Sequence, residues 1–253
     1  MPYVDYQRQG KVALITLNRP ERLNAFGSGL ASGVRECFAR FLEDGEAHVA
    51  VLRGAGRAFC AGVDAKEIAE TGRIFLREDP LSFLHPFGGK EMTKPVVAAI
   101  HGYCLGAGFN LLVMQTDIRI AAETAIFGLP EIDRGIYCLS TLFYHQLPRN
   151  IVMELTLLGN NITAQRAYEL GIVNRVVPES QLMPAALEVA NRLAGFSPLS
   201  VRLTKEGVLK MSQVAEAAFL RENALFRRSA GSEDMVEGMT AWAEKRPPQW
   251  KGK

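Results

Sequence analysis

An apolar run at residues 94–102, followed by a charge-free segment at 106–116 and a strand-like segment at 117–123, constrains the fold most strongly. The first run, KPVVAAIHG, is typical of a strand that is buried on both faces of a parallel sheet. The second segment, GAGFNLLVMQT, opens with glycines and predicts a helix that is buried on every side. Because strand and helix alternate in this way, the sequence predicts an α/β core with right-handed crossovers.

The same alternation begins earlier in the chain. Residues 11–20 and 48–56 are rich in β-branched and aliphatic side chains, which predicts two more strands. Apolar residues at helical spacing between them predict a helix at 30–44, and residues 57–70 are expected to form a tight turn and then a short helix. Residues 71–93 mix aromatics, prolines and glycines, so we expect a broken helix and a mobile loop there.

After about residue 133 the pattern becomes helical. Thr163 has the side chain of an N-cap and Gly171 that of a C-terminal stop, which brackets one short helix. Residues 173–177 predict a short edge strand. From Pro198 onward the chain is mostly amphipathic helix, whose apolar face must pack on this chain or on a neighbouring subunit. We therefore expect a core at 1–195 and a helical region at 196–253.

Composition excludes several classes of protein. Of the 253 residues, 48% are hydrophobic and 22% are charged, which is typical of a globular protein and argues against disorder. The net charge of +2 gives no indication of a nucleic-acid surface or a polybasic membrane patch. No leader pattern and no membrane-length apolar stretch is visible, so we expect a cytoplasmic protein. The four cysteines lie among apolar neighbours and are expected to be buried thiols.

The glycine-rich turn at 106–108 has two possible functions besides opening a helix. As a dinucleotide fingerprint it is a poor match, because Leu111 stands where a third glycine is needed and the segment lies in mid-chain. The alternative is an anion pocket, since the first N–H groups of a helix lack intrahelical partners. A second small-residue turn lies at 60–64, and two such N–H groups that converge on one carbonyl oxygen would form an oxyanion hole. Taken alone, each turn is better explained as a structural turn that opens a helix, because many turns share this chemistry.

Six motifs in order resemble the enoyl-CoA hydratase/isomerase (crotonase) superfamily. They are LNRPERLNAF, GAGRAFCAGVDAKEI, KPVVAAIHGYCLGAGFNL, DIRIAAETAIFGLPEIDRGI, ITAQRAYELGIVNRVV and KRPPQWKG, and they cover essentially the whole chain. The resemblance implies an α/β fold, a crotonase (ClpP-like) spiral of ββα units with a C-terminal helical trimerisation region. It implies homotrimers or homohexamers, an acyl-CoA thioester as substrate, and no partner among nucleic acids or membranes. No metal and no cofactor are expected, because coenzyme A enters as part of the substrate.

The resemblance also assigns roles to residues. The backbone N–H groups of Val63 and Ala107 would hold the thioester oxygen. Arg22 would meet phosphates, and Asp64 is also expected to cap the helix that starts at Ala65. Contacts to the substrate or its CoA part are implied for Arg22, Leu23, Ala25, Ala61, Gly62, Asp64, Ala65, Gly106 and Tyr137. For Tyr137 a place in the core or at an interface is the alternative.

The acid and base positions are where the chain departs from the hydratases it resembles. Hydratases carry two glutamates, whereas this chain has Asn110 at the first position and Glu131 at the second. An amide can hold a water but cannot take up a proton. One carboxyl is enough to move a proton between two carbons, and a buried one has the raised pKa that this requires. We therefore expect Glu131 to be the single acid/base, which favours double-bond isomerisation over hydration.

Two alternatives remain at this point. The chain could be a CoA-thioester-binding protein with little activity, because one acid is missing. It could also be a hydrolase or a C–C bond-cleaving member of the superfamily, in which Glu131 or His145 activates water, since one scaffold supports many reactions.

Overall fold

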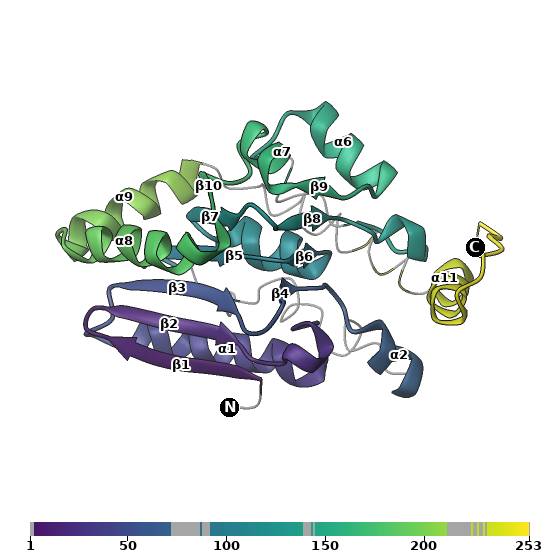
Figure 1. Ribbon diagram of the computed structural model, residues 1–253, viewed down its shortest axis with the longest axis horizontal. Coiled ribbons are helices and arrows are strands. Elements are labelled where there is room, and N and C mark those ends of the chain that lie inside the picture. Colours follow the sequence, from purple (N-terminus) through teal and green to yellow (C-terminus); the bar gives the residue numbers. More distant parts are fainter. Residues whose placement is uncertain are drawn as a thin grey trace.

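Two β-sheets form the centre of the molecule (Figure 1). The structure is a computed structural model that describes residues 3–71, 87, 92–138, 143, 145–211, 224, 227, 230 and 232–252. The loop predicted at 71–93 and much of the predicted C-terminal amphipathic helix lie outside the described residues.

The larger sheet has six strands in the order β1-β2-β3-β5-β7-β10. Its strands are β1 (Val4–Gln9), β2 (Val12–Leu17), β3 (Val49–Gly54), β5 (Val96–Ile100), β7 (Ile118–Ala122) and β10 (Arg175–Val177). From β2 to β10 the neighbours are parallel, and β1 is antiparallel to β2. The predicted strands are confirmed, including β10 at one edge. β1 was not predicted, because its sequence VDYQRQ is too polar to show a buried pattern.

Alternate residues of the parallel strands enter two different cores. Val49 and Val51 of β3 face α8 (Leu182–Ala194), which covers one side of the sheet with its alanines. Ala50 and Leu52 face the larger core, which includes α1 (Ser28–Glu43). A strand buried on both faces has no polar side, which is why these strands appear in the sequence as continuous apolar runs.

The second sheet has four short strands in the order β4-β6-β8-β9. They are β4 (Ala58–Cys60), β6 (Tyr103–Leu105), β8 (Ile126–Gly128) and β9 (Ile162–Thr163). β4, β6 and β8 run parallel, and β9 is antiparallel to β8. The expectation of a tight turn directly after residue 56 was wrong, because β4 occupies that place. A strand of two or three residues is too short for periodicity to reveal it.

The segment after β6 is buried, as predicted, but it is not a regular α-helix. A π-helical turn, η2 (Gly108–Leu112), is followed by a 3-10 turn, η3 (Val113–Gln115). The irregularity begins where the backbone presses on β4, since a Cβ on Gly108 would lie 2.6 Å from the Cβ of Cys60. The segment ends at Thr116, whose hydroxyl donates to the Val113 carbonyl at 2.7 Å.

Further helices lie in the described parts of the chain. They are α2 (Ala65–Thr71), α6 (Arg149–Leu158), α7 (Ala164–Glu169), α9 (Pro198–Met211) and α11 (Glu233–Glu244), with 3-10 turns η1 (Pro20–Arg22), η4 (Ile132–Arg134) and η5 (Glu179–Gln181). Thr163 caps α7 by accepting from the Arg166 N–H at 3.2 Å, and Gly171 follows that helix with φ of +73°, so both predicted ends are confirmed.

Three general expectations can be compared with these elements. All four cysteines are buried thiols, as predicted. In the described parts of the chain, no helix combines the length and the apolar character needed to cross a membrane. The boundary expected near residue 195 falls directly after α8 and stays a prediction.

Candidate active site

Three parallel strands of the smaller sheet bring the predicted site residues together. β4, β6 and β8 are neighbours, so their carboxyl ends lie at one edge of the sheet. The turn at 61–64 follows β4, the turn at 106–107 follows β6, and Glu131 follows β8. The crevice outside the carboxyl ends of parallel strands is the usual place for a ligand in an open α/β sheet. The arrangement therefore collects the predicted site in one place.

Backbone hydrogen bonds connect the turn after β4 to the loop after η1. The Ala61 N–H donates to the Leu23 carbonyl at 3.0 Å, and the Phe26 N–H donates to the Gly62 carbonyl at 2.7 Å. The Asp64 N–H in turn donates to the Phe26 carbonyl at 2.8 Å. These bonds place the predicted contact residues of the two segments side by side, namely Leu23, Ala25, Ala61, Gly62, Asp64 and Ala65.

The two glycine-containing turns touch each other. Gly62 has φ of +91° and Gly106 has φ of +48°, and a Cβ on Gly62 would lie 3.5 Å from the Gly106 Cα. Gly106 is fixed to β8, because its N–H donates to the Gly128 carbonyl at 2.9 Å. Within the described residues, the N–H groups of Val63 and Ala107 donate to no backbone or side-chain acceptor. Two backbone donors without acceptors thus flank the point where the turns meet.

The carboxyl of Glu131 also lies at this meeting point. A Cβ on Gly106 would lie 3.0 Å from Glu131 Oε1, so the absence of a side chain at Gly106 makes room for the carboxyl. Glu131 Oε2 is buried and has no hydrogen-bond partner in the part of the chain that the structure describes. Burial raises the pKa of Glu131 to about 7, against smaller lowering effects from its own backbone N–H and from Arg134. At least one oxygen of the Glu131 carboxyl is therefore withdrawn from solvent.

The other polar candidates lie in different surroundings. Asn110 is 3% exposed and belongs to the segment that begins at Gly106, to whose carbonyl its N–H donates at 2.8 Å. Tyr137 is half-buried and packs against the main core, so the alternative of a core role has support. His145 is exposed.

Sequence reasoning missed a buried polar group that holds the first turn in place. Asn24 is fully buried with φ of +53°, and its side chain accepts from the Arg19 N–H and donates to the carbonyls of Ala55 and Ala58. The Arg19 guanidinium lies 2.9 Å from the carboxylate of Asp64. Asp64 also caps α2, as predicted, by accepting from the Glu67 N–H at 3.0 Å. The Arg, Asn and Asp residues in LNRPERLN and GVD were the available signal. Their pairing could not be predicted from it, because Arg19 and Asp64 meet only when the chain folds.

Removing Asp64 should destabilise the protein strongly. The side chains of Arg19 and Asp64 are only 10% and 4% exposed, so Asp64→Ala leaves a buried guanidinium with Glu67 as its remaining close partner. We expect a loss of about 3 kcal/mol in the free energy of unfolding, measured by denaturant titration. Glu188→Ala is the matched control, because that carboxylate forms an exposed pair with Arg175 and should change stability by no more than about 0.5 kcal/mol. Equal effects of the two substitutions would contradict the prediction.

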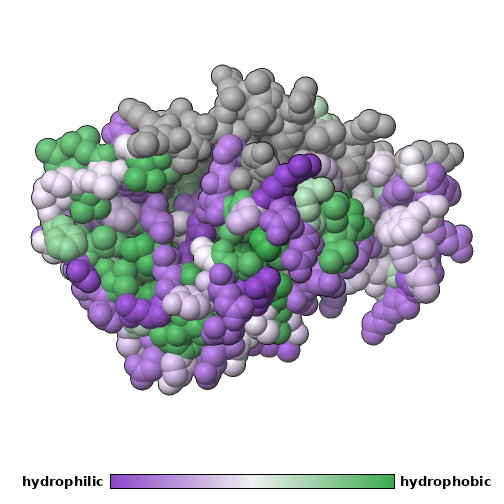
Figure 2. Space-filling view, turned by 90° about the horizontal axis from the view of Figure 1, so that it is seen from above, coloured by the Kyte–Doolittle hydropathy of each residue, from purple (hydrophilic) through white to green (hydrophobic). Residues whose placement is uncertain are grey.

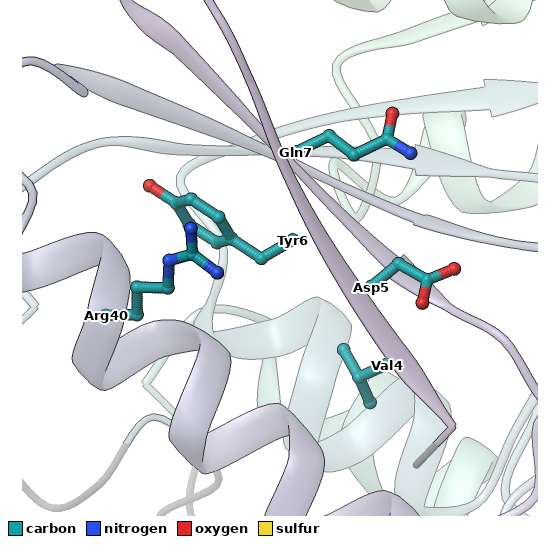
Figure 3. A pocket seen from close by; sticks show the side chains of 5 residues that line it. All are labelled: Val4, Asp5, Tyr6, Gln7 and Arg40. Atoms are coloured by element: carbon teal, nitrogen blue, oxygen red, sulfur yellow. The ribbon is translucent and has the colours of Figure 1, made fainter. Parts of the chain in front are cut away.

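A shallow pocket on another part of the surface contains none of the predicted site residues (Figure 3). It is lined by Val4, Asp5, Tyr6 and Gln7 of β1 and by Arg40 of α1. The Tyr6 hydroxyl donates to Asp44 at 2.8 Å, and the Arg40 guanidinium lies 4.3 Å from the centre of the Tyr6 ring. The Tyr6 hydroxyl and the Arg40 guanidinium are therefore already engaged, and the convergence of the three strands remains the better candidate site.

Comparisons with known proteins agree with the resemblance. Residues 7–253 match the family model described as enoyl-CoA hydratase/isomerase. A probable mitochondrial enoyl-CoA hydratase from Dictyostelium discoideum is 37% identical over 252 residues, which cover 98% of this chain and 90% of the relative. A carnitinyl-CoA dehydratase from Proteus mirabilis is 37% identical over 254 residues and 97% of both chains.

Solved structures show the same relationship at the level of the fold. The crystal structure of a carnitinyl-CoA hydratase from Mycobacterium avium matches with a TM-score of 0.88 and 34% identity, over 100% of both chains. The fold class inferred from the six motifs is confirmed by this match. The chain therefore belongs to the enoyl-CoA hydratase/isomerase family, and it is an acyl-CoA enzyme of the hydratase or isomerase type.

Proposed function

We propose that the enzyme moves the double bond of an enoyl-CoA thioester, with Glu131 as its single proton-transfer group. The observation that carries this proposal is the buried carboxyl of Glu131 at Gly106, with a pKa of about 7. A general base works best when its pKa lies near the operating pH. Asn110 stands where the hydratases that this chain resembles carry a second acid, and an amide cannot exchange a proton.

The proposed reaction keeps all atoms within the substrate. The thioester oxygen accepts hydrogen bonds from the N–H groups of Val63 and Ala107. The Glu131 carboxylate removes a proton from carbon 2 of a 3-enoyl-CoA, and the electron pair moves into a dienolate whose charge rests on that oxygen. Glu131 then returns the proton to carbon 4, which leaves the conjugated 2-enoyl-CoA. The support is that the two donors and the carboxyl adjoin the same pair of glycines, Gly62 and Gly106.

The CoA part of the substrate is proposed to lie along the loop after η1 and the turn after β4. Leu23, Ala25, Ala61 and Ala65 are small or apolar and share one edge of the site, which suits the pantetheine and adenine. Arg22 is proposed to meet a phosphate, although its guanidinium already lies 3.3 Å from Glu70 and 3.7 Å from Asp64. The side chain of Asp64 is held by Arg19 and α2, so its proposed contribution to substrate binding comes from the backbone. A contact from Tyr137 stays a prediction.

Hydration is the second candidate, and the names of the relatives favour it. One relative is named a probable enoyl-CoA hydratase and another a carnitinyl-CoA dehydratase. In this version Asn110 would hold the water and Glu131 would deprotonate it before returning a proton to carbon 2. A single carboxyl would then have to serve both steps.

Product masses separate the two candidates. Isomerisation leaves the mass of the thioester unchanged, whereas hydration adds one water. We expect a 3-enoyl-CoA to give a conjugated product of equal mass, faster than a 2-enoyl-CoA gives the hydrated product, in an assay that follows both by mass spectrometry. Faster hydration would select the second candidate. Binding of both thioesters without conversion, or release of free CoA, would contradict both and support the non-catalytic or hydrolytic alternative.

Assembly and location are also proposals. Large apolar side chains are exposed on α6 and α9, and Figure 2 shows apolar patches on the face that carries these helices. These exposed side chains include Leu157, Leu158, Leu199, Leu203 and Val208. Exposed patches of this kind mark subunit contacts, which supports the expected trimer or hexamer. The cytoplasmic location stays a prediction, because one relative is named mitochondrial. No cofactor is proposed beyond the CoA of the substrate.

A further inference from the structure

The C-terminal helix α11 lies against the turn that carries Glu131. Its N-terminus is fixed by Ser232, whose hydroxyl accepts from the Met235 N–H at 3.0 Å. The helix contacts η4, which directly follows Glu131, and also α2, which directly follows Asp64 (Figure 1). One element far along the sequence therefore touches the segments on both sides of the proposed reaction site.

Two glycines make the contact between α11 and the turn a backbone contact. A Cβ on Gly238 would lie 2.4 Å from the carbonyl carbon of Arg134 and 2.5 Å from its oxygen. Gly135 has φ of +66°, and a Cβ there would lie 2.5 Å from the Asp234 carbonyl oxygen. Distances this short leave no room for a side chain at either position. The backbone of α11 thus comes closest to the turn at Arg134 and Gly135, three and four residues after Glu131.

The side chain of Arg134 ties the turn together and to the helix. Its Nη1 donates to the Pro130 carbonyl at 2.8 Å, and its guanidinium lies 5.4 Å from the centre of the Trp242 ring. The N–H groups of Arg134 and Ile136 both donate to the Glu131 carbonyl at 3.0 Å. The backbone around Glu131 is thus closed on itself, and Arg134 links it to α11.

Acidic residues of α11 bind the end of the chain. Glu237 accepts from Nη1 and Nη2 of Arg246 at 2.6 and 3.0 Å, and from the Gln249 N–H at 2.7 Å. Asp234 accepts from the N–H groups of Lys251 and Gly252. These acids are therefore paired with the tail, and the contact of α11 with the Glu131 turn is made by Gly238 and Trp242.

We propose that Gly238 and Trp242 are positioning residues for the reaction, which hold the turn at 130–135 so that the Glu131 carboxyl stays at Gly106. Neither residue touches the substrate in this proposal. A displacement of about 1 Å in a reacting group can lower a rate by about 100-fold. The backbone donors and the segments assigned to CoA belong to the turns after β4 and β6, so binding should depend much less on α11. The inference rests on the proposed role of Glu131.

The first test is Gly238→Ala in the full chain. We expect kcat on a 3-enoyl-CoA to fall about 10- to 100-fold, while the Kd for butanoyl-CoA, a saturated and unreactive thioester, changes by less than about twofold. Gly207→Ala is the matched control, because Gly207 lies within α9 and a Cβ there would meet no described residue outside its own helix within 4 Å. It should leave both values unchanged. Parallel losses of kcat and of butanoyl-CoA affinity would overturn the proposal, since α11 would then only build the pocket.

A pair of variants at Trp242 keeps the proposal falsifiable if Gly238→Ala fails to fold. Trp242→Phe retains an aromatic face for Arg134 and should keep kcat within about twofold, whereas Trp242→Leu removes it and should lower kcat about tenfold. Folded Gly238→Ala and Trp242→Leu variants with wild-type kcat would overturn the inference, and so would Trp242→Leu alone if only it folds. If Glu131→Gln is inactive while these variants are active, only this inference fails. If Glu131→Gln is fully active, the proposed function itself fails.

Discussion

Replacing Glu131 by glutamine should lower kcat on enoyl-CoA substrates by about 10²- to 10⁴-fold, which is the usual contribution of a positioned acid or base. Glutamine has nearly the same shape and still fits beside Gly106, but it cannot take up a proton. Binding should survive, because the thioester is proposed to be held by the backbone of Val63 and Ala107. Steady-state kinetics with a 3-enoyl-CoA and a 2-enoyl-CoA, together with a Kd for butanoyl-CoA, measure the two effects separately.

The same substitution should stabilise the protein at alkaline pH. The carboxyl of Glu131 has an ordinary pKa of 4.5 when unfolded and a pKa of about 7 in the fold, where burial opposes its charge. A raised carboxyl pKa means that the fold loses stability as the pH rises from about 4.5 to about 7, and that the loss is complete above that range. Glutamine carries no charge, so Glu131→Gln should be more stable than the wild type by up to about 3 kcal/mol at pH 8 and equally stable near pH 4.

An exposed glutamate supplies the control for both effects. Glu123 lies in an exposed turn after β7, so Glu123→Gln should change neither kcat nor the pH dependence of unfolding. Full activity of Glu131→Gln would end the proposed mechanism. Low activity without a gain in stability at pH 8 would mean that the carboxyl is solvated and that its pKa is not raised by burial.

Much of the fold could be predicted because its signals are local. The segments that form β3, β5 and β7 are buried on both faces, so they are continuously apolar in the sequence. This pattern can be recognised without knowing which strands lie beside them. Thr163 and Gly171 act on the helix beside them, so their side chains and φ preferences were enough to locate its ends.

The convergence of the site could not be predicted from periodicity. It depends on β4, β6 and β8, which have three residues each, and on their parallel order within one sheet. The two turns were recognised as possible donors, but only the family resemblance placed them together. The sheet supplies the physical reason, because it sets Gly106 directly beside Gly128 and Gly62.

The contact between α11 and the turn of Glu131 was even harder to predict from the sequence. Gly238 lies in a helical stretch, where a lone glycine indicates only a weaker helix. Its meaning comes from Arg134, about a hundred positions earlier, whose backbone occupies the space of the missing side chain. Contacts of this kind form between two segments that are far apart in the sequence. Neither segment alone has a property from which the contact could be predicted.

Gly106→Ala should be strongly damaging to catalysis. Gly106 has φ of +48°, and its new Cβ would lie 3.0 Å from Glu131 Oε1 and 3.5 Å from the Gly62 Cα. The methyl group would therefore push the carboxyl away from the point where the two turns meet. We expect kcat to fall about 100-fold, because the proton-transfer group is displaced, and the free energy of unfolding to fall by about 1–2 kcal/mol from the left-handed backbone.

Gly10→Ala separates these two causes. Gly10 has a similar φ of +58° and lies in the turn between β1 and β2, where a Cβ would meet none of the described residues within 4 Å. It should therefore share the loss of stability and keep full activity. If the two variants lose stability equally and Gly106→Ala also retains wild-type kcat, then the carboxyl does not occupy the place that the fold reserves for it. The proposed geometry of proton transfer would then have to be abandoned, whatever Glu131→Gln shows.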